Sequence, residues 1–189
     1  MLSKEQELKD LKLQMEKDTS LPLEPANLVF GEGDINSDIL FIGEAPGQKE
    51  DELIRPFVGR SGQLLNKMLG LINLRREDVY ITNIVKRRPP ENRDPAPQEI
   101  EAYSPYLARQ LEILRPLVIF TLGRFSMNYF LPEAKISKDQ GKIFKTKDKL
   151  IVPMFHPAAA LRNPSVMREF EETFKKVPAI IASCKKAQK

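Results

Sequence analysis

Cysteine is almost absent from this chain of 189 residues, which contains a single one, Cys184, close to the carboxyl terminus. One cysteine excludes an internal disulfide bond, and one thiolate cannot form a cysteine cage around a metal. Long apolar runs are absent too, since no stretch approaches the roughly 20 residues that a membrane-spanning helix requires. The amino terminus is charged where a secretory signal peptide would become apolar. These features predict a cytoplasmic protein that does not enter a membrane.

Apolar and charged residues occur in the proportions of a folded globular protein, at 41% and 30% of the chain. The length falls within the range of one domain, so we expect residues 1–189 to form a single domain. Lysine and arginine, 30 in all, exceed the 26 aspartates and glutamates and give a formal net charge of +4. This charge suits a polyanionic partner but does not require one. No pattern indicates an oligomer interface, and we expect a monomer.

Four short apolar runs, each rich in β-branched or aromatic residues, are separated by segments long enough to form helices. The runs predict buried strands at Asp38–Glu44, Val79–Val85, Leu117–Gly123 and Leu150–Phe155. One intervening segment, Ser61–Ile72, has apolar residues at the spacing of a helix with one buried face. The alternation predicts an α/β fold, a three-layer sandwich with a central four-stranded, mostly parallel sheet flanked by helices.

Further helices are predicted on either side of these strands. A charged helix is expected at Ser3–Asp18, within residues 1–18, and another at Val166–Ser183, the start of a segment at 166–189 that ends in a basic tail. Pro97–Leu114 is helical in pattern but contains Ser104-Pro105, which predicts two helices, with one kinked helix as the alternative. Lys142–Lys149 is expected to form a small hairpin leading into the last strand.

The carboxyl ends of the predicted strands are the first place to look for chemistry, because open parallel sheets bind their ligands there. Five segments of the chain are the most informative, and two of them lie at strand ends. They are Gly43–Glu50, Arg55–Gly62, Tyr80–Lys86, Pro89–Pro95 and His156–Pro164.

Taken in order, these five segments resemble the uracil-DNA glycosylase superfamily, and most closely its family 4, the iron–sulfur type. The resemblance extends from about Val29 to Phe170. It implies a monofunctional DNA glycosylase of base excision repair, which flips deoxyuridine out of DNA, hydrolyses its N-glycosidic bond and leaves an abasic site. Two alternatives stay open: a non-catalytic DNA-binding or lesion-sensing protein that keeps the fold, and an α/β protein that binds nucleotide phosphate at the Gly43–Gly47 turn.

The resemblance assigns catalytic roles to three residues. Glu44 would stabilise the oxocarbenium-like sugar and orient or deprotonate the attacking water, unless it is only an exposed loop residue. His156, the single histidine of the chain, would stabilise the departing base through a ring N–H, although a lone histidine is more often structural. Glu50 could be a second carboxylate acting through water, a wall against the 5-methyl group of thymine, or a residue favoured by a helix dipole.

Uracil itself would be held by four residues of the same segments. Phe57 would stack on the extruded base, unless it is a core phenylalanine. Asn83 presents a donor and an acceptor that can read N3 and O4 of uracil, while a turn-capping asparagine is the competing interpretation. Ala45 and Gly47 would let backbone N–H groups approach the base or a phosphate, which is compatible with a simple tight turn.

Basic residues near these segments are expected to contact DNA. Four lie in a short proline-interrupted run, for which a solvated charge run is the alternative, and Leu161 and Arg162 follow the histidine on what we expect to be a loop. Leu161 would enter the duplex where the base has left, unless it packs in the core. The predicted contacts are Lys86, Arg87, Arg88, Arg93, Leu161 and Arg162.

The sequence departs from the family at its cofactor. Family 4 members typically hold a [4Fe–4S] cluster through four cysteines, and this chain has none at those positions. Arg87 and Tyr103 occupy the last two positions, and Lys17 and Ser20 fall roughly at the first two. We therefore predict that no cluster or metal is bound, and that Arg87 stacks on Tyr103 in a cation–π contact.

Overall fold

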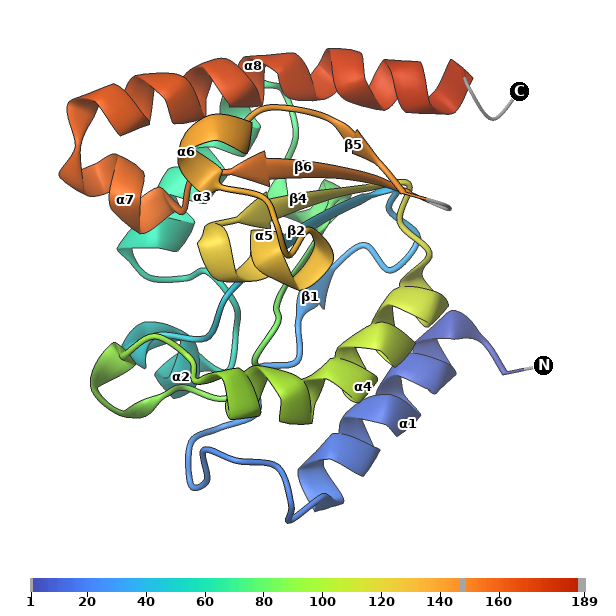
Figure 1. The fold of residues 1–189 in the computed structure, drawn as a ribbon. Coiled ribbons are helices and arrows are strands. Elements are labelled where there is room, and N and C mark those ends of the chain that lie inside the picture. The colour runs from blue at the N-terminus through green and yellow to red at the C-terminus, as the bar shows by residue number, and fades with distance from the viewer. Residues whose placement is uncertain (1, 147–148, 187–189) are drawn as a thin grey trace.

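A computed structural model describes residues 2–146 and 149–186 and shows one mixed sheet at the centre of the molecule (Figure 1). Six strands run in the order β1-β3-β2-β4-β6-β5. Strands β3, β2, β4 and β6 are parallel to one another, and the edge strands β1 and β5 pair antiparallel to β3 and β6. Their bounds are β1 Glu32–Gly33, β2 Ile39–Gly43, β3 Tyr80–Asn83, β4 Val118–Leu122, β5 Phe144–Lys145 and β6 Leu150–Met154.

The three-layer α/β class is confirmed, but the predicted number of strands is wrong. The four predicted strands form the parallel centre of the sheet, and two further strands of two residues each extend its edges. Such short edge strands have no run of apolar residues long enough to show an alternating pattern. The expected hairpin corresponds to β5 and β6, which pair antiparallel, and residues 147–148 of the predicted segment lie outside the described residues.

Helices cover both faces of the sheet. Helices α3, α7 and α8 pack on one face, while α1, α4 and α5 pack on the other (Figure 1). No helix in the described part of the chain has the length and apolar character needed to cross a membrane. The bounds are α1 Lys4–Lys17, α2 Gln48–Leu53, α3 Arg60–Leu71, α4 Pro97–Leu114, α5 Arg124–Phe130, α6 Ile136–Asp139, α7 Pro157–Arg162 and α8 Pro164–Lys186.

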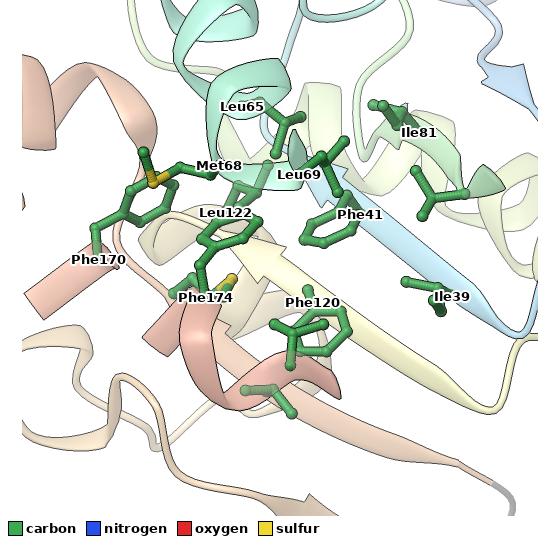
Figure 2. Packing of buried hydrophobic residues seen from close by; sticks show 14 of the residues in the cluster. Ile39, Phe41, Leu65, Met68, Leu69, Ile81, Phe120, Leu122, Phe170 and Phe174 are labelled. Atoms are coloured by element: carbon green, nitrogen blue, oxygen red, sulfur yellow. The ribbon is translucent and has the colours of Figure 1, made fainter. Parts of the chain in front are cut away.

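Strand residues alternate between two apolar clusters, one on each face. Phe41 of β2 stacks on Phe120 of β4 with ring centroids 5.0 Å apart, and on Phe174 of α8 at 5.7 Å (Figure 2). The adjacent Leu40 and Ile42 face the opposite cluster, beneath α1 and α4. Because both faces are covered, the central strands are apolar throughout, which is why they are recognisable as continuous apolar runs.

Helix α4 is continuous from Pro97 to Leu114, so the predicted division at Ser104-Pro105 is wrong and the single-helix alternative holds. Proline within a helix removes one backbone hydrogen bond. Tertiary packing outweighs this loss, because Tyr103 and Leu107, on either side of Pro105, are completely buried. At the carboxyl terminus, α8 begins two residues before the predicted start at Val166 and continues to Lys186.

Candidate active site

A pocket of about 700 Å³ opens at the carboxyl ends of β2, β3, β4 and β6. Its position matches the expectation for an open parallel sheet. Most of the residues predicted to act on substrate line it, together with several that were not predicted. The predicted lining residues are Glu44, Ala45, Gly47, Glu50, Phe57, Asn83, Arg93, His156 and Arg162.

Gly43, the last residue of β2, lets two of these side chains converge. A Cβ atom on Gly43 would lie 2.5 Å from Oδ1 of Asn83 and 2.5 Å from Cζ of Phe57. Neither distance leaves room for a methyl group, and Asn83 is the β3 residue paired with Gly43 in the sheet. A glycine at this position is therefore needed to bring the amide and the aromatic ring together at the pocket.

Asn83 has an unsatisfied acceptor. The residue is only 2% exposed, and its Oδ1 is buried with no hydrogen-bond partner. This arrangement argues against the turn-capping interpretation, in which that oxygen would accept a backbone N–H. A buried acceptor without a partner costs about 1–3 kcal/mol, which a ligand N–H group would recover.

Phe57 is buried in the apolar cluster between the sheet and α3, and it also lines the pocket. The core and stacking interpretations are therefore compatible. Its ring centroid lies 6.0 Å from that of His156. Its backbone has a φ of +50°, a left-handed conformation that is uncommon for a residue other than glycine.

Glu50 holds the backbone beside Phe57. One carboxylate oxygen of Glu50, Oε1, accepts hydrogen bonds from the backbone N–H groups of Val58 at 2.8 Å and Gly59 at 2.7 Å. The side chain lines the pocket, but these two contacts fix its orientation. The geometry therefore favours an anchoring function for Glu50, which none of the three predicted interpretations included.

His156 is neutral and has a defined tautomer. It caps the amino end of α7, where its Nδ1 accepts a hydrogen bond from the backbone N–H of Ala158 at 3.1 Å. Burial, with a smaller contribution from Arg162, lowers the pKa of His156 to about 4 against an opposing effect of Glu50. At neutral pH the ring proton therefore resides on Nε2, which is the donor that stabilisation of a departing base requires.

The pocket likewise disfavours the charged form of Glu44, its carboxylate. Burial, and then the charge of Asp94, raise the pKa of Glu44 to about 7, while Arg124 opposes the shift. Arg124 and Asp94 both line the pocket and form an ion pair at 2.6 Å. The sequence analysis assigned neither residue a function, although Arg124 lies two residues beyond β4 and Asp94 lies in one of the five segments.

The burial of Lys86 contradicts its prediction as a DNA contact. Its side chain is completely buried, and Nζ donates to Oγ1 of Thr82 at 2.6 Å, to the carbonyl oxygen of Asn83 at 2.7 Å and to Oε1 of Gln110 at 2.6 Å. Burial lowers the pKa of Lys86. The hydroxyl of Thr82 donates to the carbonyl of Phe30, so all three partners act as acceptors and favour the ammonium form, which alone carries three protons.

Arg87 is likewise unavailable to phosphate, since it is 7% exposed and donates to the carbonyl of Ala26 at 3.0 Å. Its guanidinium also pairs with Glu24 at 3.2 Å. Arg93 is partly exposed but forms an ion pair with Glu99 at the start of α4. Arg88 is half-buried, and its Nε donates to Asn92 at 2.7 Å.

The segment after His156 is helix α7 rather than the expected loop. Leu161 and Arg162 lie in its last turn, and both are exposed. Leu161 is 38% exposed, which contradicts the interpretation of this side chain as part of the core. Arg162 lines the pocket beside His156.

The four positions that cluster cysteines occupy in the family do not fit an iron–sulfur cluster. Lys17 and Ser20 are exposed, whereas Arg87 and Tyr103 are buried, and none of the four supplies a thiolate. Within residues 2–146 and 149–186, no group of three or more histidine, cysteine or acidic side chains could hold a metal ion. Cys184, on α8, is the one cysteine.

The predicted cation–π contact between Arg87 and Tyr103 is wrong. The cation–π pairs of the described residues are Lys86 with Phe30 and Arg124 with Phe125. The hydroxyl of Tyr103 instead donates to the carbonyl of Pro22 at 2.8 Å. Arg87 binds the same loop at Ala26, so both buried residues fasten residues 18–27 to the body of the protein.

Comparisons with known proteins identify one family. Residues 30–178 match the family model described as the uracil DNA glycosylase superfamily. The chain is 47% identical over 160 residues to the type-4 uracil-DNA glycosylase of Archaeoglobus fulgidus, covering 80% of each protein. It is 42% identical over 170 residues to the type-4 uracil-DNA glycosylase of Thermotoga maritima, covering 87% of this chain and 88% of that protein.

Proposed function

The chain belongs to the uracil-DNA glycosylase superfamily, and from this we propose that it hydrolyses the N-glycosidic bond of deoxyuridine in DNA and leaves an abasic site. One observation carries the proposal. A single pocket brings together a buried acceptor without a partner on Asn83, a neutral donor on His156 and a carboxyl group on Glu44. A flipped uracil needs an N–H acceptor, a donor for its oxygen and a carboxylate near the sugar.

The base would be selected by Asn83 and Phe57. Oδ1 of Asn83 can accept the N3–H of uracil, while its amide N–H donates to O4. Cytosine has no N3–H and carries an amino group at C4, so it would present the reversed pattern. Stacking on the ring of Phe57 would add about 1–3 kcal/mol without depending on base identity.

Bond cleavage would use His156 and Glu44 in separate steps. As the bond from C1′ to N1 breaks, its electron pair passes to the base, and the Nε2–H of His156 stabilises the charge that develops on O2. The Glu44 carboxylate stabilises the positive sugar, orients a water molecule and accepts its proton as the oxygen bonds to C1′. The uracil anion then takes up a proton from solvent and Glu44 releases its proton to solvent, so that the products are free uracil and an abasic site.

Phosphate contacts would come from exposed or partly exposed arginines around the pocket. Arg162 and Arg124 are exposed and line the pocket, and Arg88 and Arg93 lie on the neighbouring segment. Leu161, exposed on α7 next to Arg162, is positioned to fill the space that the flipped nucleotide leaves. Affinity that depends on these arginines should fall steeply as salt is added.

The reaction needs no step through an iron–sulfur cluster, and we propose that this chain acts without one. Its single cysteine cannot provide four ligands. Tyr103 and Arg87 fasten the 18–27 loop with hydrogen bonds at the positions that cluster cysteines occupy in the family. We further propose that one domain, acting as a monomer, carries the whole site.

The function can be tested by incubating the purified protein with an end-labelled oligonucleotide that contains one uracil, followed by alkaline cleavage at abasic sites. We expect cleavage by the unmodified protein and a fall of at least about 100-fold for Glu44→Gln and for His156→Ala. Glu52→Gln is the matched control, because Glu52 lies on α2 and pairs with Lys49 outside the pocket.

Failure to cleave would count against the proposal only if the protein is folded and binds the oligonucleotide. That combination would exclude uracil excision and favour the non-catalytic DNA-binding alternative. Equal activity of Glu44→Gln and the unmodified protein would exclude the role given to this carboxylate.

A further inference from the structure

The loop Pro56–Gly59, which carries Phe57, has an unusual backbone that other residues must stabilise. Phe57 adopts a left-handed conformation with φ of +50°, and such residues persist only where their surroundings hold them. Helix α3 packs directly on this backbone, since a Cβ on Gly62 would lie 1.7 Å from the carbonyl oxygen of Phe57. The direction in which the Phe57 ring points therefore depends on how the loop backbone is fixed.

Arg76 binds the carbonyl side of the loop from outside the pocket. It lies in the 3₁₀ turn Arg76–Asp78, and its side chain is 10% exposed. One guanidinium nitrogen donates to the carbonyl of Phe57 at 2.8 Å, and another donates to the carbonyl of Pro56. A rigid guanidinium that donates to two successive carbonyls fixes the orientation of both peptide groups.

Glu32 of the edge strand β1 holds Arg76 in place. Its carboxylate accepts hydrogen bonds from Arg76 and from Arg55. Burial alone would raise the pKa of Glu32, but the hydrogen bonds from Arg55 and Arg76 keep it below its ordinary value. Glu32 is therefore ionised at neutral pH and anchors the guanidinium electrostatically.

The N–H side of the same loop is held from within the pocket by Glu50, which accepts from Val58 and Gly59. Arg76 thus binds carbonyl groups of the loop that carries Phe57, and Glu50, of opposite charge, binds its N–H groups. Glu50 lines the pocket, whereas Arg76 does not.

We propose that Arg76 is a positioning residue for uracil excision, which acts by fixing the carbonyls of Pro56 and Phe57 so that the Phe57 ring is held against the base. The proposal rests on the function proposed above. Its effect on the reaction must pass through Phe57, because Arg76 itself touches neither the pocket nor its contents.

A double-mutant cycle tests this dependence. We expect Arg76→Met, which keeps an unbranched side chain but removes every donor, to lower the single-turnover rate of uracil release about tenfold, the size of a lost stacking contact. In a Phe57→Ala background the same substitution should change the rate by less than about twofold, since groups that act as a unit are not additive. A merely structural effect would lower the rate equally in both backgrounds.

Arg55→Met is the matched control, because Arg55 pairs with the same carboxylate of Glu32 but donates to neither carbonyl. It should leave the rate unchanged. Hydrogen exchange of the Val58 and Gly59 amides provides a second readout that does not need activity, and it should accelerate in Arg76→Met but not in Arg55→Met. If Arg76→Met does not fold, Arg76→Lys, which keeps the charge but not the planar fork, takes its place.

Each outcome separates the two proposals. A folded protein that binds the oligonucleotide but releases no uracil overturns the function, and hydrogen exchange then decides whether Arg76 fixes the loop. A protein that releases uracil, with equal effects of Arg76→Met in the two backgrounds or with unchanged exchange, overturns the role of Arg76.

Discussion

At the scale of single residues, burial in one pocket favours the uncharged forms of both Glu44 and His156. The pKa of Glu44 is raised to about 7, and that of His156 is lowered to about 4. Between pH 5 and 8 the imidazole therefore stays neutral while the carboxyl group titrates. His156 is therefore the hydrogen-bond donor to the base, and Glu44, once ionised, is the general base that accepts a proton from water.

The first prediction is a rate of uracil excision that rises with pH through about 7, because only the ionised Glu44 carboxylate can act on water. Asp94 raises this pKa, so Asp94→Asn should move the midpoint of the single-turnover profile to lower pH. Arg124 lowers it, so Arg124→Gln should move the midpoint to higher pH.

Glu172→Gln is the control for that profile, since Glu172 is exposed on α8 and pairs with Lys175. Its midpoint should match that of the unmodified protein. A rate that falls as pH rises from 5 to 7, or a midpoint that Asp94→Asn leaves in place, would contradict the assignment of the base.

The second prediction separates two neighbouring basic residues. Lys86→Met leaves three buried acceptors without their donor and should lower the free energy of unfolding by about 3 kcal/mol, with no change in the salt dependence of DNA binding. Arg88→Met should have little effect on unfolding but reduce the slope of log affinity against log salt by about 1. Chemical denaturation and binding titrations at several salt concentrations measure both. A reduced salt slope for Lys86→Met would show that Lys86 contacts phosphate, which would contradict the conclusion drawn from its burial.

Local pattern explains which of these residues could be predicted. Glu44, Asn83 and His156 follow or end buried strands, and parallel strands bring their carboxyl ends to one edge of the sheet. Lys86 also lies just beyond a strand, but its acceptor on Gln110 comes from α4, 24 residues away. No local pattern in the basic run distinguishes a lysine with such a partner from an exposed one.

At the scale of secondary structure, the 18–27 loop is held by hydrogen bonds from buried side chains. Tyr103 of α4 and Arg87, just beyond β3, donate to its carbonyls at Pro22 and Ala26. Tyr106 of α4 also donates to Asp18 at 2.6 Å. These bonds connect the end of α1 to α4 and β3.

The third prediction concerns this loop. Arg87→Met removes a charged donor that is almost completely buried and should lower the free energy of unfolding by about 2–3 kcal/mol. Tyr103→Phe removes one neutral hydrogen bond and should lower it by about 1 kcal/mol. Denaturant unfolding measures both effects.

The rate of uracil release from each folded variant is the accompanying control. It should equal that of the unmodified protein at a temperature well below unfolding, because the loop residues Pro22 and Ala26 lie outside the pocket. A large loss of rate without a loss of stability would give the loop a direct role in the reaction.

Elements were predictable where one physical property dominates their sequence. The four central strands are buried on both faces and are therefore apolar throughout. The predicted division of α4 is wrong because local propensity gives Pro105 a large weight. The helix is continuous because the burial of Tyr103 and Leu107 stabilises it. The turn that carries Arg76 is three residues long and has no pattern of its own.

At the scale of the whole molecule, the sheet separates two apolar clusters, and the chemistry is confined to one edge between them. The site residues are therefore positioned by the ends of four strands, and helices packed on both faces of the sheet fix these strands. The 18–27 loop is held against α4 and lies apart from the pocket lining. Tyr103 and Arg87 therefore fix a peripheral loop, whereas the site residues are positioned by the strand ends.

The most direct test of uracil excision without a cluster is to measure iron content and single-turnover uracil release on the same preparation, before and after prolonged chelation. We predict that nearly every chain releases uracil, that iron atoms are far fewer than chains, and that chelation changes neither the rate nor the thermal unfolding temperature. Activity that rises and falls with iron content, or that is lost on chelation, would contradict a cluster-free glycosylase.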